Sequence, residues 1–223
     1  MRHKLNKQFS CSEQKVLEEL MLLRRDVRGN KFLNEEVPDE AIDQILHAAS
    51  LAPSVGFSQP WEFVIVRDNK TRQSIVDNFN RENDIAEKQF SGQKRQQYSK
   101  LKLEGILQAP VNIAVFYKPS QAPVLGQNSI PEVGEYSVVC AVQNMWLMSR
   151  ALNIGLGWVS ILDADAVKST LKVPDNYKLI AYLCLGYVDE FLDAPELEIL
   201  QWEQRKPIHD VVHYDCFKDD YLS

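Results

Sequence analysis

The sequence predicts an α+β protein in which a mixed β-sheet is flanked by helices. Helix-like and strand-like stretches follow one another along the 223 residues without strict βαβ repetition. The stretch 179–188 is almost continuously apolar, as in a strand that is covered on both faces. The stretch 136–152 is apolar nearly all round, which is typical of a buried helix. We therefore expect one domain built around this strand and this central helix.

Local signals predict the remaining elements. The first helix is expected from Ser12, as its N-cap, to about Arg25. A second helix opens at Pro38, because proline is favoured in the first turn. Asn153 and Gly155 are expected to end the central helix. Further helices are expected to start near Asp68 and Asp163, and strands are expected at 61–66, 111–117 and 158–162.

Two parts of the chain lie outside this expected core of 12–188. The stretch 80–105 is polar and charged with few apolar anchors, and we expect it to form a lid. The C-terminal extension 189–223 is too irregular for a second domain but carries several large aromatic residues. We expect it to pack on a partner subunit, because aromatic side chains need a surface to cover them.

Composition excludes several classes of function. Lys and Arg number 25 against 31 Asp and Glu, and a net charge of −6 argues against nucleic acid and against an anionic membrane surface. We find no apolar run long enough to span a bilayer. The four cysteines are scattered, and His209 and His213 lack the acidic pattern of a zinc site, so we expect no metal and a cytoplasmic location.

The run Arg24-Arg25-Asp26-Val27-Arg28 is the first candidate site. Guanidinium groups suit a phosphate because they bind its oxygens in pairs. The alternative is a solvated helix end, where cations are favoured by the helix dipole. Asp26 either neutralises an arginine or acts as an acid or base beside a bound anion.

Two further segments are weaker candidates. The loop 52–61 (A-P-S-V-G-F-S-Q-P-W) contains Ser54, Ser58 and Gln59, which suit either a polar ligand or an ordinary rigid turn. Gly155-Leu156-Gly157 is not a dinucleotide fingerprint, and it is either a turn that lets a flat ligand approach the backbone or a helix end before a strand.

Taken together, these segments resemble the FMN-binding nitroreductase-like family. The resemblance rests on the arginine run, the A-P-S-x-x-x-x-Q-P-W loop, the Gly-Leu-Gly turn and a late Arg205, and it spans about residues 24–205. It implies an α+β homodimer that binds FMN at the subunit interface. The family's usual Asn is replaced here by Phe57.

A narrower resemblance is to the BluB group of this family, the 5,6-dimethylbenzimidazole synthases. It rests on L-A-P-S-V-G-F-x-Q-P-W, Y-S-V-V-C-A-V-Q-N, G-W-V-S-I and Y-L-C-L-G-Y-V-x-x-F. It implies that reduced FMN is a substrate, which O₂ fragments to dimethylbenzimidazole, the lower-ligand base of vitamin B12, and erythrose 4-phosphate. The one departure is Ser58, where a bulkier apolar residue is expected.

The resemblance also implies roles for individual residues. Asp26 and Ser160 match the positions important for fragmentation, and the arginines match those that hold the FMN phosphate. We expect Asp26 to act as acid or base and Ser160 to donate a hydrogen bond to the ring. The full set of implied FMN contacts is Arg24, Arg25, Asp26, Val27, Arg28, Ser54, Gly155, Leu156, Gly157, Ser160 and Arg205.

Two other functions remain open on the same residues. One is an NAD(P)H-dependent FMN nitroreductase or flavin reductase, which would retain its flavin and accept hydride without a nicotinamide fingerprint. The other is a flavin-binding or storage protein without catalysis. For a synthase, NAD(P)H could enter indirectly, through a separate flavin reductase that supplies reduced FMN, and the sequence leaves open a direct NAD(P)H site.

Overall fold

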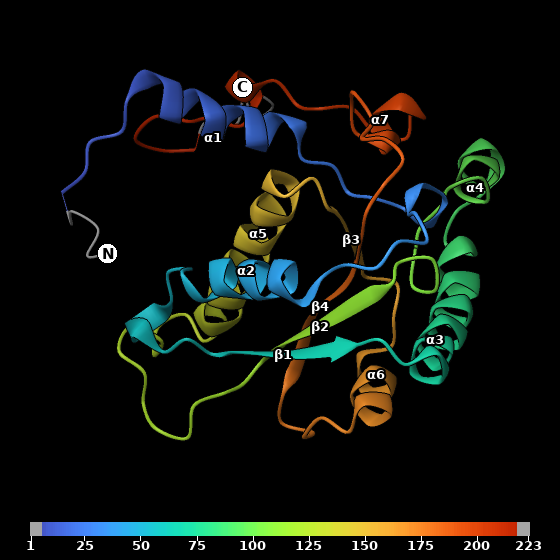
Figure 1. Ribbon diagram of the computed structural model, residues 1–223, viewed down its shortest axis with the longest axis horizontal. Helices are drawn as coiled ribbons and strands as arrows, with labels where there is room; N and C mark the ends of the chain where they lie inside the picture. Colours follow the sequence, from blue (N-terminus) through green and yellow to red (C-terminus); the bar gives the residue numbers. More distant parts are fainter. Residues whose placement is uncertain (1–5, 218–223) are drawn as a thin grey trace.

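The computed structural model describes residues 6–217 and confirms the α+β fold (Figure 1). The sheet has the order β1-β2-β4-β3, and each neighbouring pair is antiparallel. The expected mixed sheet is therefore antiparallel in its four strands, and parallel pairing appears as an isolated bridge between Asp26 and Leu156. The strands are β1 (Trp61–Val66), β2 (Val111–Tyr117), β3 (Gly155–Val159) and β4 (Lys178–Gly186).

Helices cover both faces of the sheet, as the apolar stretch 179–188 predicts. One face packs on α2 (Asp39–Ser50) and α5 (Val133–Ala151), with Leu183 of β4 in that core. The other face packs on α3 (Asn69–Glu87) and α6 (Ala164–Leu171), with Tyr182 of β4 in that core. Consecutive residues of β4 thus serve opposite cores, because successive side chains of a strand point to opposite faces.

The N-terminal helix α1 (Cys11–Leu23) begins one residue earlier than its predicted cap at Ser12. Ser10 is the N-cap, and Glu13 completes a capping box by accepting from the Ser10 backbone N–H at 2.9 Å. The helix ends before Arg24, so the arginine run is extended backbone. Within the described residues 6–217, none of the α1 side chains is buried.

The region around Gly155 differs from the sequence prediction. Helix α5 starts at Val133 rather than near 136, and Asn153 ends it with a left-handed φ of 57°. Strand β3 then starts at Gly155 rather than at 158 and stops before Ser160. The Gly-Leu-Gly segment is therefore part of a strand and not a turn.

The expected lid contains the end of α3 and a short helix, α4 (Gly92–Tyr98), followed by a loop to 105. In its described part, the C-terminal extension contains a short α-helix, α7 (Glu196–Ile199), which lies next to α4 in Figure 1, and a 3-10 turn at Ile208–Asp210. Residues 218–223 of the extension fall outside the described residues. Among residues 6–217, no helix combines the length and the hydropathy that crossing a bilayer requires.

Candidate functional site

The segment 24–28 forms an extra strand-like edge beside β3. Val27 donates its backbone N–H to the Leu156 carbonyl at 3.1 Å, and Asp26 and Leu156 form an isolated parallel β-bridge. In extended backbone, alternate side chains point to opposite sides. Accordingly, Arg24, Asp26 and Arg28 are partly exposed, whereas Arg25 and Val27 are buried.

The glycines of β3 allow this close approach. A Cβ on Gly157 would lie 2.1 Å from the Val27 carbonyl oxygen, which no side chain tolerates. A Cβ on Gly155 would lie 2.5 Å from the Val188 side chain. Both glycines, and Leu156 between them, are buried. The sequence suggested that these glycines let a flat ligand approach the backbone. In the structure the segment with Asp26 and Val27 lies against Gly157 instead, so this glycine positions those two residues.

Asp26 is the carboxyl group of this site. Its Oδ1 accepts from the Trp158 backbone N–H at 2.9 Å, and its other oxygen pairs with Arg28. Burial raises the pKa of the Asp26 carboxyl, outweighing the Arg28 charge and the Trp158 N–H, which lower it. Asp26 is therefore poised to bind or release a proton closer to neutrality than an ordinary aspartate.

Arg25 has a different role from its two neighbours. Its guanidinium donates to the backbone carbonyls of Leu22 and Leu192 at 2.7 Å each, and to those of Arg24 and Asp193. Burial lowers the pKa of Arg25, and the positive charges of Arg24 and Arg205 lower it further. Four of its five donors are thus used by the chain, and it ties segment 192–193 to the arginine run.

Arg24 and Arg28 border a cavity of about 210 Å³, which we name the arginine cavity. The Arg24 guanidinium lies 4.7 Å from the centre of the Trp146 ring, and Trp146 donates its ring N–H to the Arg25 carbonyl at 3.0 Å. These contacts fix the arginine's direction. The cavity is lined by Arg24, Arg25, Asp26, Arg28, Pro195, Glu196 and Leu197.

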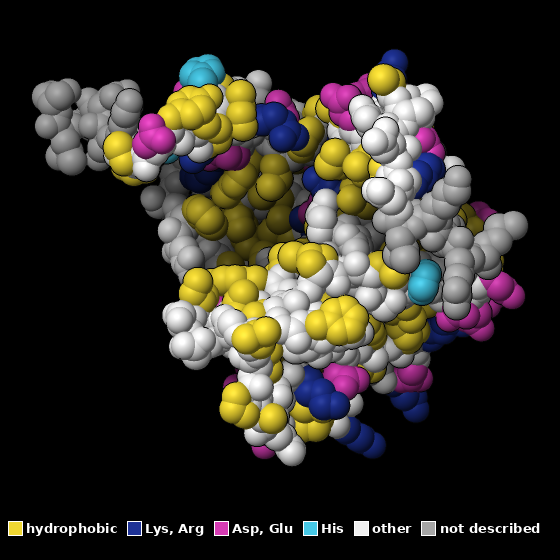
Figure 2. All heavy atoms as spheres, turned by 90° about the vertical axis from the view of Figure 1, so that its left-hand side faces the viewer, with side chains coloured by type: hydrophobic (Ala, Val, Ile, Leu, Met, Phe, Trp, Pro, Cys, Tyr) yellow, Lys and Arg dark blue, Asp and Glu magenta, His cyan; other side chains and the backbone are white. Residues whose placement is uncertain are grey.

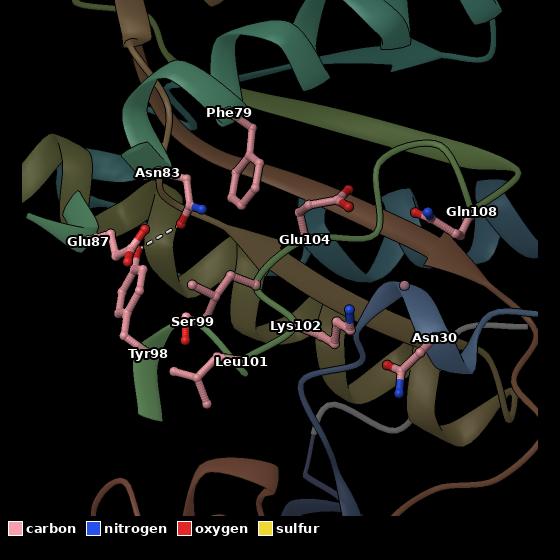
Figure 3. Close-up of a pocket in the computed structure, with 12 residues that line it drawn as sticks. Asn30, Phe79, Asn83, Glu87, Tyr98, Ser99, Leu101, Lys102, Glu104 and Gln108 are labelled. Atoms are coloured by element: carbon pink, nitrogen blue, oxygen red, sulfur yellow. Dashed lines mark hydrogen bonds between the residues drawn. The ribbon is translucent and has the colours of Figure 1, made fainter. Parts of the chain in front are cut away.

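A second cavity of about 390 Å³, the lid cavity, lies under the expected lid (Figure 3). Gly29 and the loop before β2 touch there, with the Gly29 N–H donating to the Glu104 carbonyl at 2.8 Å. Arg28 reaches towards the same loop and donates weakly to the Leu103 carbonyl at 3.4 Å. The lining residues are Gly29, Asn30, Phe79, Asn83, Glu87, Tyr98, Ser99, Leu101, Lys102, Leu103, Glu104 and Gln108.

Sequence reasoning missed this second cavity as a binding surface. Its polar side chains, such as Asn30, Lys102 and Gln108, belong to no motif. One signal was available, because Gly29 and Gly105 are isolated glycines in polar loops. A Cβ on Gly105 would lie 3.0 Å from the Gly29 nitrogen, and a Cβ on Gly29 would lie 3.0 Å from the Glu104 carbonyl oxygen, so both glycines permit the two loops to approach closely.

The other expected site residues lie at varying distances from Asp26. Ser160 is exposed and lies just past the end of β3, two residues after Trp158, whose backbone N–H binds Asp26. At the rise per residue of a strand, the Cα atoms of Trp158 and Ser160 are roughly 7 Å apart. Arg205 is exposed and near enough to influence Arg25.

The loop containing Ser54 is not brought to the arginine cavity. It lies across the molecule, at the left in Figure 1, and the Ser54 hydroxyl accepts from the Gln59 N–H at 3.1 Å. Nearby, the Ser58 hydroxyl oxygen is buried without a hydrogen-bond partner among residues 6–217. In one chain, the two expected halves of the flavin site are therefore separate.

An uncovered apolar face lies between these halves. Helix α5 exposes Tyr136, Val139 and Cys140, and α1 exposes Leu17 and Met21. Figure 2 shows a hollow with a largely hydrophobic floor beneath α1. Positions 136, 139 and 140 share one side of a helix, so α5 presents an apolar stripe outward as well as inward.

Comparison with known proteins gives the family. The nitroreductase family model matches residues 22–187. A 5,6-dimethylbenzimidazole synthase from Rhodospirillum rubrum is 43% identical over 206 residues, which are 92% of this chain and 96% of the synthase. A second such synthase, from Rhodobacter capsulatus, is 34% identical over 89% of this chain and 96% of its own.

Solved structures share the fold. An iodotyrosine deiodinase bound to FMN and 3-iodo-L-tyrosine superposes with a TM-score of 0.72 at 24% identity, covering 90% of this chain and all of the other (100%). A BluB-like flavoprotein from Clostridium difficile 630 gives 0.67 at 24% identity over 89% of this chain and 98% of its own. With matches over nearly its whole length, the chain belongs to the nitroreductase family, within the group of the 5,6-dimethylbenzimidazole synthases.

Proposed function

We propose that this protein is a 5,6-dimethylbenzimidazole synthase that fragments reduced FMN with O₂. The observation that carries the assignment is the 43% identity to a synthase over 92% of the chain. The geometry supports it, because Asp26 has a raised pKa and lies between Arg24 and Arg28 at the arginine cavity. FMN is then a substrate, consumed in each turnover.

Arg24, Arg28 and Arg205 are suited to the phosphate of FMN. Arg24 and Arg28 border the arginine cavity, and Arg205 is exposed close to it. We assign Arg25 a different task from the one that the resemblance implies. Its guanidinium hydrogen-bonds to four backbone carbonyls, so it holds the wall of the cavity and adds only its positive field.

Asp26 is proposed as the acid or base of the reaction. A carboxyl with a raised pKa keeps a larger protonated fraction near neutral pH and can both give and take a proton. The Trp158 N–H fixes one of its oxygens, so the carboxyl plane has a defined direction. Ser160, just beyond β3, would donate a hydrogen bond to the ring of the flavin.

One chain does not supply the whole site. The arginine cavity, at about 210 Å³, is smaller than the roughly 300–1,000 Å³ of typical ligand pockets. It fits the phosphate end of FMN, and the remainder needs the lid cavity or a second subunit. We propose a homodimer in which the apolar stripe of α5 is covered and the loop with Ser54 of the second copy completes the site.

Fragmentation of reduced FMN requires that water be kept from the site. Five carbons of the ribityl chain yield erythrose 4-phosphate and one carbon for the imidazole ring of the product. The competing reaction, FMNH₂ + O₂ → FMN + H₂O₂, needs no enzyme. We propose that the lid segment 80–105 excludes water, so that fragmentation can compete with this reoxidation. We also propose a cytoplasmic location, with which four free cysteines are consistent.

The deciding experiment mixes the protein with chemically reduced FMN and air. A synthase consumes flavin and yields a benzimidazole of the expected mass together with erythrose 4-phosphate. Quantitative return of oxidised FMN, with NAD(P)H oxidation when that is added, indicates the reductase. Return of FMN without NAD(P)H oxidation indicates a storage protein. Lys100→Met is the matched control variant, because the Lys100 side chain is exposed and lines neither cavity.

A further inference from the structure

The C-terminal segment 189–202 forms one wall of the arginine cavity. Arg25 holds its first part through the carbonyls of Leu192 and Asp193. Pro195, Glu196 and Leu197 then line the cavity opposite the arginines. The wall is thus fixed at its start by a buried guanidinium.

The far end of this wall is fixed by the lid. Lys94 of α4 donates to the Trp202 carbonyl at 2.6 Å, and its ammonium nitrogen lies 3.9 Å from the centre of the Trp202 ring. Phe90 meets the same ring edge-on, with centroids 5.3 Å apart, and Tyr98 lies 6.1 Å away. Three lid side chains therefore surround one residue of the C-terminal segment.

Helices α7 and α4, which this contact joins, have few other contacts that hold them in place. Helix α7 has no buried residue among its four positions and ends at Ile199, and Gln201 just after it has a φ of 55°. Trp202 then donates its N–H back to the Leu197 carbonyl at 2.8 Å. Elements with little buried surface open easily, so the position of α7 depends on its ends.

The lid helix α4 depends on similar contacts. Arg95 pairs with Glu87 at 3.0 Å, and the Tyr98 hydroxyl donates to Asn83 at 2.8 Å (Figure 3). These two contacts join α4 to α3, and neither reaches the wall of the arginine cavity. Among residues 6–217, the hydrogen bond between α4 and that wall is the one that Lys94 donates to the Trp202 carbonyl.

We propose that Lys94 and Trp202 are positioning residues that hold the lid against the wall of the arginine cavity, and that this contact sets the ratio of fragmentation to reoxidation. The inference rests on the proposed function. The loop 101–104 follows α4 directly and lines the lid cavity, so release of α4 loosens the loop that Arg28 contacts. Water then reaches the site, and reduced FMN returns as FMN and H₂O₂.

The test compares products in air after addition of chemically reduced FMN. Dimethylbenzimidazole and H₂O₂ are measured per flavin oxidised for the wild type, Trp202→Ala and Lys94→Met. Lys94→Met loses both the charge-assisted hydrogen bond and the cation–π contact, whereas Trp202→Ala keeps the backbone carbonyl but loses the cation–π contact and the ring contacts with Phe90 and Tyr98. We expect the product ratio to fall about tenfold in each variant. Lys94→Arg, which keeps the cation, should restore the ratio to within about threefold. Lys100→Met on the same lid should leave it unchanged.

A second measurement does not depend on turnover. Hydrogen exchange of the backbone amides of 92–102 should accelerate in Trp202→Ala and Lys94→Met but not in Lys100→Met. Where Trp202→Ala does not fold, Lys94→Gln carries the test with the same expectation. A wild type that makes no benzimidazole overturns the proposed function. A wild type that makes it, with unchanged product ratio and unchanged exchange in Lys94→Met, overturns the role of Lys94 and Trp202 alone.

Discussion

The substitution Gly157→Ala tests how the site is built. The new Cβ would lie 2.1 Å from the Val27 carbonyl oxygen, whereas ordinary contact begins near 3.4 Å. The segment 24–28 must therefore move away from β3 by more than about 1 Å. Two hydrogen bonds cross this gap: Val27 N–H to Leu156 at 3.1 Å and Trp158 N–H to Asp26 at 2.9 Å.

The cost follows from these two bonds. A neutral bond contributes about 0.5–1.5 kcal/mol and one to a charged group about 1.5–3 kcal/mol, so Gly157→Ala should lower the free energy of unfolding by about 2–4.5 kcal/mol. Most of the dimethylbenzimidazole yield should also be lost, because Asp26 no longer has a fixed direction. Urea unfolding followed by tryptophan fluorescence gives the first quantity, and product analysis gives the second.

The control for this change is Gly155→Ala in the same strand. Its Cβ would first meet a methyl group of Val188 at 2.5 Å, and a side chain can shift where a backbone cannot. It should therefore cost less stability than Gly157→Ala. If Gly157→Ala is as stable as the wild type and keeps its yield, the close packing of 24–28 on β3 does not position the site.

Four further predictions concern the charges and the apolar face. Asp26→Asn should bind reduced FMN normally but form product about 10²–10⁴-fold more slowly, as single-turnover analysis will reveal. Arg28→Met removes a charge that lowers the Asp26 pKa, so the pH–rate limb of Asp26 should move to higher pH; an unmoved limb means that another group titrates. Arg25→Met should lower the unfolding free energy by about 2–4 kcal/mol, as measured by urea titration. Arg24→Met should mainly weaken FMN binding, as measured by flavin titration. Val139→Asp on the outer face of α5 should give a monomer by sedimentation, and a persistent dimer would place the interface elsewhere.

Much of the fold is predictable because its signals are local. Strands 61–66 and 111–117 agree with β1 and β2 to the residue, and Asp68 and Asp163 cap their helices as expected. The start of β3 is missed because two glycines carry no strand signal of their own. Their role becomes visible only when the segment beside them is known to be extended.

The candidate site was predictable in its residues but not in its geometry. The arginine run and Asp26 stand out by composition, but Arg25 faces inward because of an alternation that appears only once α1 is known to end at Leu23. The lid cavity depends on Gly29 meeting Gly105, a contact between distant parts of the chain. Ser54 remains a prediction that concerns a second subunit.

The strand order has a consequence for the folding rate of the protein. β4 comes last in the sequence but lies between β2 and β3, so β3 cannot join the sheet until residues 178–186 have been inserted. The segment 24–28 in turn pairs with β3, so the site lies at the edge of a sheet that is built from long-range pairings. Such pairings slow folding because large loops must close first. The arginines and Asp26 should therefore acquire their native arrangement in a late kinetic phase, after most of the secondary structure has formed.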